Sequence, residues 1–220
     1  MKKILCTSAA ILMMGSAFAN DRAYEVTITN ITSNQIFTPI LAATHSTNIS
    51  YFELGNPASI ELATLAESGN PAPLEEVLLS TPSLVHDTEN SAPLLSDGLL
   101  RPGESVTLEL STSRGFPRLS LAAMLIPTND TFMALDSVYL PRRTDTEVYF
   151  AKAYDAGTED NDELCDNIPG PACGGIGFSE ESTSDEGFVH ISAGIHGEGD
   201  LLASEYDWRD AVAKITISRK

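Results

Sequence analysis

The amino-acid sequence predicts an all-β fold, an antiparallel β-sandwich with one short helix in a connecting segment. Several segments alternate apolar and polar residues with the two-residue period of a strand that has one buried face. Clusters of Gly, Pro, Asn and Asp separate these segments and indicate turns. Many short strands divided by such turns are typical of a sandwich.

The expected strands follow one another along the chain. The first covers 24–29, where Tyr24, Val26 and Ile28 share one face. A continuous apolar run at 119–126 suits a central strand that is covered on both faces. Further strands are expected at 105–110, 146–150, 188–191 and 213–217, with turns at 101–103, 114–117, 127–130 and 197–200.

One helix is expected after residue 56. Asn56 can cap it, Pro57 suits the first helical position, and Gly69 ends the apolar run. A weaker helical turn is expected at 74–79. The stretch 80–102 mixes Pro, Ser, Asn and Asp without a regular period, so we expect a long surface loop there.

The first residues predict export from the cytoplasm. Lys2 and Lys3 precede an apolar run at 4–14 that ends in small residues, which is the pattern of a secretory signal peptide cut after Ala19. No later stretch reaches the roughly 20 apolar residues of a transmembrane helix. We therefore expect a signal peptide of bacterial type at 1–19, a single domain at 20–220, and a secreted or periplasmic protein.

The chain is strongly acidic. It holds 31 Asp and Glu residues against 13 Lys and Arg residues, a formal net charge of −18, and the loss of Lys2 and Lys3 with the signal peptide makes the charge more negative. Such a field repels nucleic acids and anionic lipid surfaces, and it favours cations or basic partner surfaces. Solubility alone is the other explanation of the charge.

Two of the three cysteines remain once the signal peptide, which carries Cys6, is removed. Cys165 and Cys173 are then an even pair in an exported chain, and such a pair is most simply a disulfide. The bridge would close a small loop and stabilise the fold by less than roughly 3 kcal/mol. A zinc site is the alternative, but two cysteines without a nearby histidine are a poor ligand set.

A series of short motifs runs along the chain, and the most specific of them is the Asp-Ala-Gly-Thr-acid segment at 155–159. The others lie at 24–30, 43–45, 52–55, 127–130, 187–190 and 206–209. In their order and spread, these motifs resemble the spondin N-terminal domain family, and they are closer to its bacterial members than to the animal F-spondin type. The resemblance implies an antiparallel β-sandwich similar to the calcium-dependent membrane-binding domains of protein kinase C type, with one calcium ion at a loop end.

The resemblance also implies the metal ligands. Carried over by motif, they are Asp130, Asp155 and Glu159, with backbone carbonyls and water completing the shell. Animal members have an aspartate where this chain has Glu159 followed by Asp160, so the choice of the third ligand stays open. The residue types suit calcium, which prefers six to eight hard oxygen ligands. Gly157 gives the chain between two of these ligands the freedom to fold around an ion.

A solvated acidic loop without fixed ligand geometry is the alternative to a metal site. It would comprise Asp155, Glu159, Asp160, Asp162, Glu163 and Asp166. Clustered carboxylates without a cation repel one another and raise the pKa of at least one member. A divalent ion would remove that repulsion.

A second group of candidates is His190, His196 and Asp200, which could hold a transition metal or act as acid and base. Their spacing matches no zinc-hydrolase motif, and His190 lies within a strand pattern, so both histidines could equally serve the fold. Trp208 has two interpretations as well, a ligand-stacking aromatic residue or a core residue before the last strand.

These observations predict an exported calcium-binding module for extracellular or periplasmic binding or adhesion, without catalysis. Animal relatives of the family are matrix and cell-adhesion proteins. The expected partner is an extracellular protein or a polysaccharide, and neither nucleic acid nor a transmembrane segment is expected. The alternative function is a metal-assisted hydrolase that uses His190, His196 and Asp200, and a third is a purely structural secreted domain.

Overall fold

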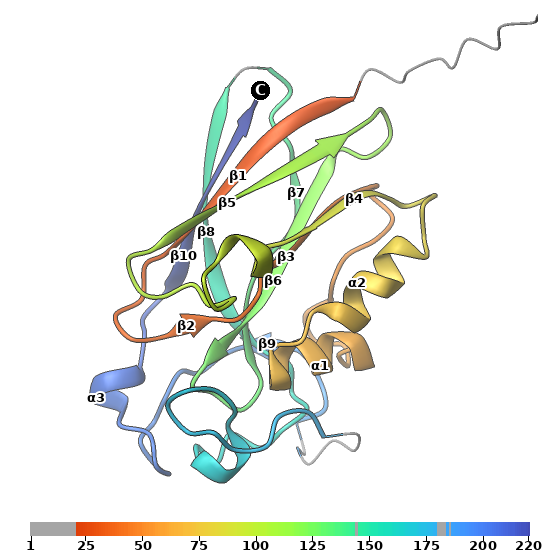
Figure 1. Ribbon diagram of the computed structural model, residues 1–220. Coiled ribbons are helices and arrows are strands. Elements are labelled where there is room, and N and C mark those ends of the chain that lie inside the picture. The colour runs from red at the N-terminus through yellow and green to blue at the C-terminus, as the bar shows by residue number, and fades with distance from the viewer. Residues whose placement is uncertain (1–20, 144, 180–183, 185) are drawn as a thin grey trace, which may run out of the picture.

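The structure is a computed structural model that describes residues 21–143, 145–179, 184 and 186–220. The expected signal peptide at 1–19 lies outside the described residues. Long strands run along one axis of the molecule, two helices lie against one side of the sheet, and the loops that follow β8 (Thr146–Asp155) gather at one end (Figure 1). The last strand ends beside the start of the first strand, at the opposite end.

The remaining strands are β1 (Arg22–Asn30), β2 (Ile36–Phe37), β3 (Leu41–His45), β4 (Val85–Asn90), β5 (Ser105–Thr112), β6 (Arg118–Ile126), β7 (Thr131–Tyr139), β9 (His190–Ile191) and β10 (Ala211–Arg219). The helices are α1 (Ile60–Ser68), α2 (Ala72–Leu79) and the single turn α3 (Ala203–Tyr206), and 3-10 turns cover Ala92–Leu94 and Cys165–Asn167. The five long strands expected from the sequence are all present, and each is longer than its sequence pattern.

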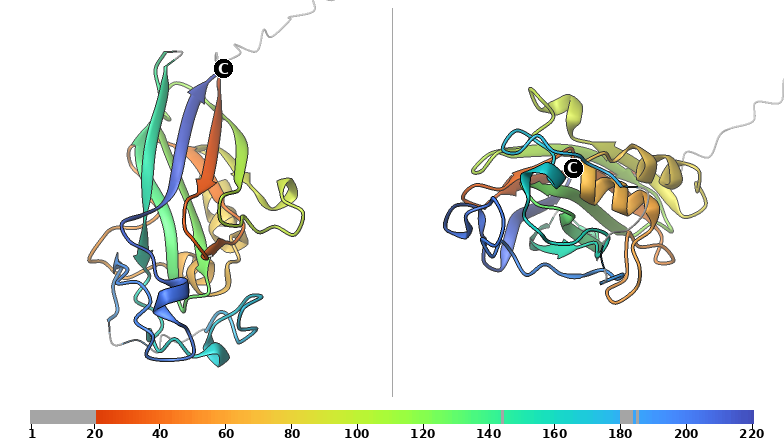
Figure 2. Two further views of the ribbon diagram at one scale, coloured as in Figure 1. Left: turned by 90° about the vertical axis from the view of Figure 1, so that its left-hand side faces the viewer. Right: turned by 90° about the horizontal axis from the view of Figure 1, so that it is seen from below.

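The described strands belong to one antiparallel system. Eight of them follow the order β4-β3-β6-β7-β8-β10-β1-β5, while β2 pairs with β6 and β9 pairs with β8. The two edge strands come back together, because the backbone N–H of Ser111 on β5 donates to Asp87 on β4 over 2.7 Å. The all-β class is therefore confirmed, and the two layers of the sandwich are formed by a single sheet that folds on itself and nearly closes (Figure 2).

The inner face of this sheet encloses the main hydrophobic core. On β1, Tyr24, Val26 and Ile28 are fully buried, as their alternation predicts. Leu108 on β5 is also fully buried, and truncating such a leucine to alanine typically costs about 2–5 kcal/mol. The packed strands thus form a rigid support for the loops at the end of the molecule.

Helices α1 and α2 cover the outer face of β3, β6 and β7 with a second hydrophobic layer. Helix α1 begins after Ser59, whose hydroxyl accepts a hydrogen bond from the backbone N–H of Leu62 over 3.2 Å, and ends at Gly69 as predicted. The predicted cap at Asn56 is wrong, because the Asn56 amide donates to Glu53 over 2.7 Å instead. The single expected helix is followed by a second, α2, which extends the weaker turn expected at 74–79.

The middle of the chain differs from the expected loop at 80–102, because β4 lies within it. Strand β4 is at the edge of the ladder, and its residues after Val85 are only half-buried, so its alternation is weak. Strands β3 and β7 were not predicted either. Successive residues on both strands are buried, since one face packs on the main core and the other on the helices.

A third, small hydrophobic cluster stabilises the loop end. Its buried members are Ile168, Ile195 and Leu201. The disulfide between Cys165 and Cys173 packs against this cluster, which confirms the expected bridge and leaves neither thiol free for zinc. Trp208 is half-buried between this cluster and the main core. Both interpretations of Trp208 therefore stay open, because it packs against the two clusters and also lines a hollow at the surface.

Candidate metal centre

Asp130 lies in the turn between β6 and β7 and is completely buried. Its Oδ2 accepts hydrogen bonds from the backbone N–H of Thr158 (2.8 Å), the backbone N–H of Glu159 (3.1 Å) and the Thr158 hydroxyl (3.2 Å). One carboxylate thus ties the turn to the segment that follows β8. Its other oxygen, Oδ1, is buried and has no hydrogen-bond partner among the described residues.

Asp155 is the last residue of β8 and stands opposite Thr131, next to Asp130. Its Oδ1 accepts from the backbone N–H of Gly157 over 2.8 Å, and its Oδ2 accepts from the side-chain amide of Asn161 over 2.9 Å. Gly157 has a φ of 67°, and a Cβ there would lie 2.3 Å from a backbone oxygen of the segment that leads into β9. Only glycine therefore lets the chain turn back beside this carboxylate.

Glu159 is 6 % exposed, and a second buried acid, Glu67 of α1, lies near it. The backbone N–H of Ser179 donates to Glu67 over 2.8 Å, and the Ser179 hydroxyl donates to Glu159 Oε1 over 3.4 Å. Glu159 Oε2 is buried without a partner in the described part of the chain. Glu67 was missed by the sequence analysis, although an acid in the last turn of a helix opposes the helix dipole and is a usable signal.

Burial raises the pKa of all four carboxyl groups. The pKa of Asp130 rises to about 7, because burial disfavours its charged form and Asp155 lies close by. The pKa of Glu159 rises to about 8, first through burial and then through the neighbouring charges of Glu67 and Asp130. The pKa values of Asp155 and Glu67 are also raised, chiefly by burial. Burial and mutual repulsion disfavour the charged carboxylates at this end of the molecule, and a cation bound there would stabilise them.

Two buried oxygens without donors are the feature that fits a metal ion best. Nearly all buried polar atoms in proteins have a hydrogen-bond partner, and leaving one without costs about 1–3 kcal/mol. Asp130 Oδ1 and Glu159 Oε2 both lack a partner among the described residues, while the other oxygen of each carboxylate is bonded. Buried carboxylate oxygens of this kind are ligands that a divalent cation with a preference for hard oxygens, such as calcium, accepts.

The three predicted ligands approach one another to different degrees. Asp130 and Asp155 are neighbours across the β7–β8 ladder, and Glu159 is held beside Asp130 through its backbone. The ligand atoms of these three residues do not form a group within 4.8 Å of one another. Among the described residues, the group that meets this distance is Asp155, Glu186 and His190. In that group, His190 Nε2 lies 2.7 Å from Glu186 and 3.6 Å from Asp155. Asp155 therefore takes part in both arrangements.

The other predicted constellation, His190, His196 and Asp200, is divided among different partners. His190 lies with Glu186, as above. His196 Nδ1 lies 3.9 Å from Glu163, and its side chain is 54 % exposed. Asp200 accepts a hydrogen bond from the backbone N–H of Cys165 over 2.9 Å. The structure thus gives each of these three side chains a different role in the loops.

The acidic segment 155–166 is not uniformly solvated. Its buried acids are Asp155, Glu159 and Glu163, its half-buried acid is Asp162, and its exposed acids are Asp160 and Asp166. Asp162 accepts hydrogen bonds from the side-chain amides of Asn129 (2.9 Å) and Asn167 (2.6 Å). The alternative of a freely solvated acidic loop therefore does not describe the buried members of this segment.

Comparison with known protein families identifies the family of this chain. The sequence model of the Spondin_N family, the spondin N-terminal domain, matches residues 23–164, which is more than half of the 220-residue chain. The chain belongs to the spondin N-terminal family. The Spondin_N match contains Asp130, Asp155 and Glu159, whereas the motifs at 187–190 and 206–209 lie beyond its end. No curated protein matches the sequence significantly.

The residues beyond the Spondin_N match complete the spondin sheet. Strand β9 pairs with the end of β8, and β10 pairs with both β8 and β1. Among the residues that the structure describes, this spondin chain has no helix of the length and apolar character needed to cross a membrane.

Proposed function

We propose that this protein is an exported binding or adhesion module in which a calcium ion, held by Asp130, Asp155 and Glu159, fixes the loops that meet an extracellular partner. The observation that carries this proposal is the pair of buried carboxylate oxygens, Asp130 Oδ1 and Glu159 Oε2, without a donor among the described residues. The Spondin_N match and the disulfide support a location outside the cytoplasm.

The ligand chemistry favours calcium over the other common ions. Calcium accepts six to eight oxygens at about 2.3–2.6 Å in variable geometry, whereas magnesium demands near-octahedral ligands at shorter distances and keeps several waters. Carboxylates on separate loops suit the more tolerant ion. Imidazole favours zinc and related metals, so the group of Asp155, Glu186 and His190 is where a transition metal would compete.

The ion would act on the loops, and the proposal includes no catalytic step. Asp130 joins the β6–β7 turn to the segment after β8. Asp155 pairs with His190 of β9. These loops gather at the same end of the sheet (Figure 2). Fixing them before a partner arrives reduces the conformational freedom lost on binding. The partner is an extracellular protein or a polysaccharide.

The test is a calcium titration of the exported chain after removal of bound metal with EGTA. Calorimetry should detect one site, and calcium at a hundred times the dissociation constant should stabilise the fold by about 2.7 kcal/mol. For a domain of this size, each kcal/mol raises the melting temperature by roughly 2–4 °C. Asp155→Asn should abolish both signals. Asp166→Asn, a matched change at an exposed acid of the same segment, should preserve both.

Equal melting temperatures in calcium and in EGTA would contradict the proposal. A shift produced by zinc but not by calcium, and lost in His190→Ala, would move the site to the group of Asp155, Glu186 and His190. Because Asp155 belongs to both groups, His190→Ala is the variant that separates the two metal sites.

A further inference from the structure

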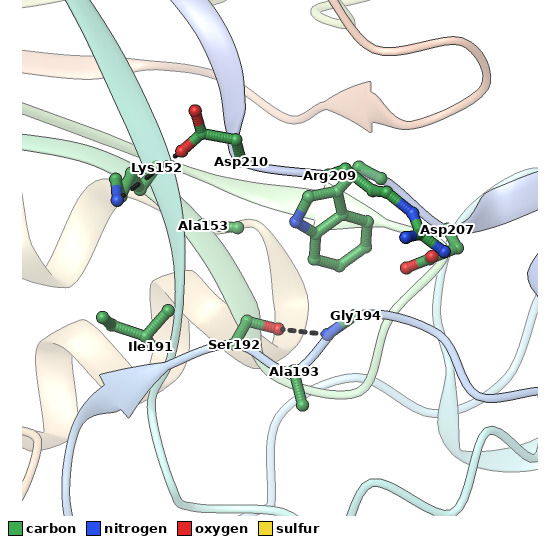
Figure 3. Close-up of a pocket in the computed structure, with 10 residues that line it drawn as sticks. Lys152, Ala153, Ile191, Ser192, Ala193, Gly194, Asp207, Arg209 and Asp210 are labelled. Atoms are coloured by element: carbon green, nitrogen blue, oxygen red, sulfur yellow. Dashed lines mark hydrogen bonds and ion pairs between the residues drawn. The ribbon is translucent and has the colours of Figure 1, made fainter.

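A hollow of about 380 Å³ opens at the junction of β8, β9 and the segment that leads into β10 (Figure 3). Its walls come from Lys152 and Ala153 on β8, from 191–194 and from 207–210. The volume lies within the range of roughly 300–1,000 Å³ that is usual for small-molecule sites. None of the three proposed calcium ligands lines this hollow, so it is a separate site.

Two side chains in the wall carry hydrogen-bond donors that have no partner among the described residues. Trp208 is the only tryptophan of the chain, and its indole N–H makes no hydrogen bond to another described residue. The exposed guanidinium of Arg209 has neither a hydrogen bond nor an ion pair within the described ranges. A guanidinium carries five N–H donors in a rigid fork. The wall therefore presents an apolar aromatic ring beside an array of unused donors.

The charges that line the hollow balance one another. Lys152 and Arg209 oppose Asp207 and Asp210, and Lys152 Nζ lies 3.5 Å from Asp210 Oδ1 (Figure 3). The net charge of −18 on the whole chain repels an anion, and the hollow has no excess negative charge to hold a cation. A neutral ligand rich in hydroxyl groups fits, because each hydroxyl both donates and accepts hydrogen bonds. Sugar rings combine such hydroxyls with apolar C–H faces that can lie against an indole.

The wall is held in place by contacts with the rest of the fold. Asp207 Oδ1 accepts from the backbone N–H of Ile195 over 3.2 Å. Gly194, with a φ of 89°, leaves room for this carboxylate, since a Cβ there would lie 2.3 Å from Asp207 Oδ1. The Ser192 hydroxyl lies 3.0 Å from that of Thr131, and the Ser192 backbone N–H donates to the β8 backbone over 3.2 Å. A preformed wall loses little freedom when a ligand binds.

Lys152 also lines a second hollow, of about 470 Å³, between β8, β7 and the segment 52–54. The second hollow contains Phe52, Tyr154 and Phe150, and Phe150 is 60 % exposed. The ring centroids of Phe52 and Tyr154 lie 4.9 Å apart. Each of the two hollows thus offers aromatic surface beside polar groups, and one lysine belongs to both. This arrangement suits a ligand made of successive rings more than a single ring.

We propose that this surface binds a neutral oligosaccharide. One sugar ring lies against Trp208 and is hydrogen-bonded by Arg209 and Asp207. The following rings pass Lys152 towards Phe150. The inference rests on the proposed function in one respect, since it names the partner of the binding module as a polysaccharide. It does not depend on a calcium ion at Asp130.

The test uses the intrinsic fluorescence of Trp208, which reports this site alone because the chain has no other tryptophan. The probes are neutral hexasaccharides of β-1,4-linked glucose, β-1,3-linked glucose, β-1,4-linked N-acetylglucosamine and β-1,4-linked mannose, each compared with its monosaccharide. At least one hexasaccharide should change the fluorescence saturably and bind about tenfold more tightly than its monosaccharide. Arg209→Gln should weaken binding about tenfold through loss of charged hydrogen bonds.

Arg114→Gln is the matched control, because Arg114 is an exposed arginine in the distant turn between β5 and β6. It should leave the affinity unchanged. Trp208→Phe, followed by calorimetry, should weaken binding about tenfold. If that variant fails to fold, the Arg209→Gln comparison decides the question.

Three results would overturn the oligosaccharide site. The first is no saturable change with any neutral hexasaccharide at millimolar concentration. The second is binding of sulfated or carboxylated hexasaccharides only, and the third is undiminished binding by Arg209→Gln. Titrations in calcium and in EGTA keep the two proposals apart. Sugar binding in both buffers supports this site whatever the calcium result, and a calcium response without sugar binding refutes this site alone.

Discussion

Glu163 and Asp130 are two buried carboxylates at the same end of the molecule, but their surroundings differ. Glu163 accepts hydrogen bonds from the backbone N–H groups of His196, Gly197 (2.7 Å) and Glu198 (2.9 Å), and these bonds use both of its oxygens. Asp130 has all of its described donors on one oxygen, and the other oxygen has none. Only Glu163 is complete without an ion.

This difference separates a carboxylate that holds the fold from one that is ready for a ligand. Burial is common to both residues, so burial alone does not identify a binding site. An unsatisfied oxygen distinguishes Asp130 from Glu163, because an unsatisfied buried atom costs free energy that a bound cation can recover. Substitutions at the two residues should therefore have opposite signatures.

We expect the largest effect from Asp130→Asn, which should abolish the stabilisation by calcium. The amide keeps one oxygen that can accept the N–H groups of Thr158 and Glu159, but it removes the charge that a cation needs. The stabilisation of about 2.7 kcal/mol expected at a hundred times the dissociation constant should vanish. Circular dichroism melts with and without calcium measure it. A calcium shift of unchanged size would remove Asp130 from the metal site.

Glu163→Gln should destabilise the fold by about 1–3 kcal/mol, because the amide nitrogen cannot accept the backbone N–H groups of the 196–198 turn. The loss should be the same in calcium and in EGTA, and urea denaturation in both buffers measures it. If the Glu163→Gln variant kept its stability but lost calcium binding, Glu163 would be a calcium ligand and the contrast with Asp130 would be wrong.

A change of pH should shift the stability of the calcium-free protein. The pKa values of Asp130 and Glu159 are about 7 and about 8 in the folded chain, against about 4 in an unfolded chain. The folded state therefore binds more protons between these values, and its free energy of unfolding should fall as the pH rises through this window.

Urea midpoints in EGTA between about pH 5 and about pH 8 measure this dependence, and we expect a loss of at least about 1 kcal/mol towards the higher pH. Saturating calcium should remove or reverse the trend, because the ion stabilises the charged carboxylates. A calcium-free protein that gains stability with rising pH over this range would argue against the raised pKa values of both residues.

The smallest effect is expected from Asp160→Asn, since Asp160 is exposed. Stability should change by less than about 0.5 kcal/mol, and the calcium affinity should be unchanged. The matched change at the neighbouring buried acid, Glu159→Gln, should weaken calcium binding about tenfold or more. Calorimetric titration of both variants compares them, and the reverse pattern would make Asp160 the third ligand.

The sequence predicted those parts of the fold whose signal is local. Strands β1 and β10 alternate because one face is buried and the other is open, and that pattern depends on residues two apart. Strand β7 escaped prediction because the core and the helices bury both of its faces. The cap of α1 was misplaced because both Asn56 and Ser59 suit that role, and only the structure gives Asn56 another partner.

The carboxylates proposed to hold calcium could be chosen from the sequence, whereas their surroundings could not. The order of motifs pointed to Asp130, Asp155 and Glu159, which lie on the β6–β7 turn, the end of β8 and the segment after it. The surroundings of Asp130 depend on the contact between the β6–β7 turn and the segment after β8, and no local pattern encodes that contact. Glu67 was missed for a related reason, because α1 reaches the site from a distant part of the chain.

The position of β10 has a consequence for how the molecule assembles. Strand β10 lies between β8 and β1 although it follows every other described strand in the sequence. Before β10 is in place, β1 can pair only with β5, and the edges of β1 and β8 that will hold β10 are unpaired. Pairing between segments so far apart in the sequence is slow, because the chain between them must first lose freedom. The sheet therefore closes only after the C-terminal strand is available.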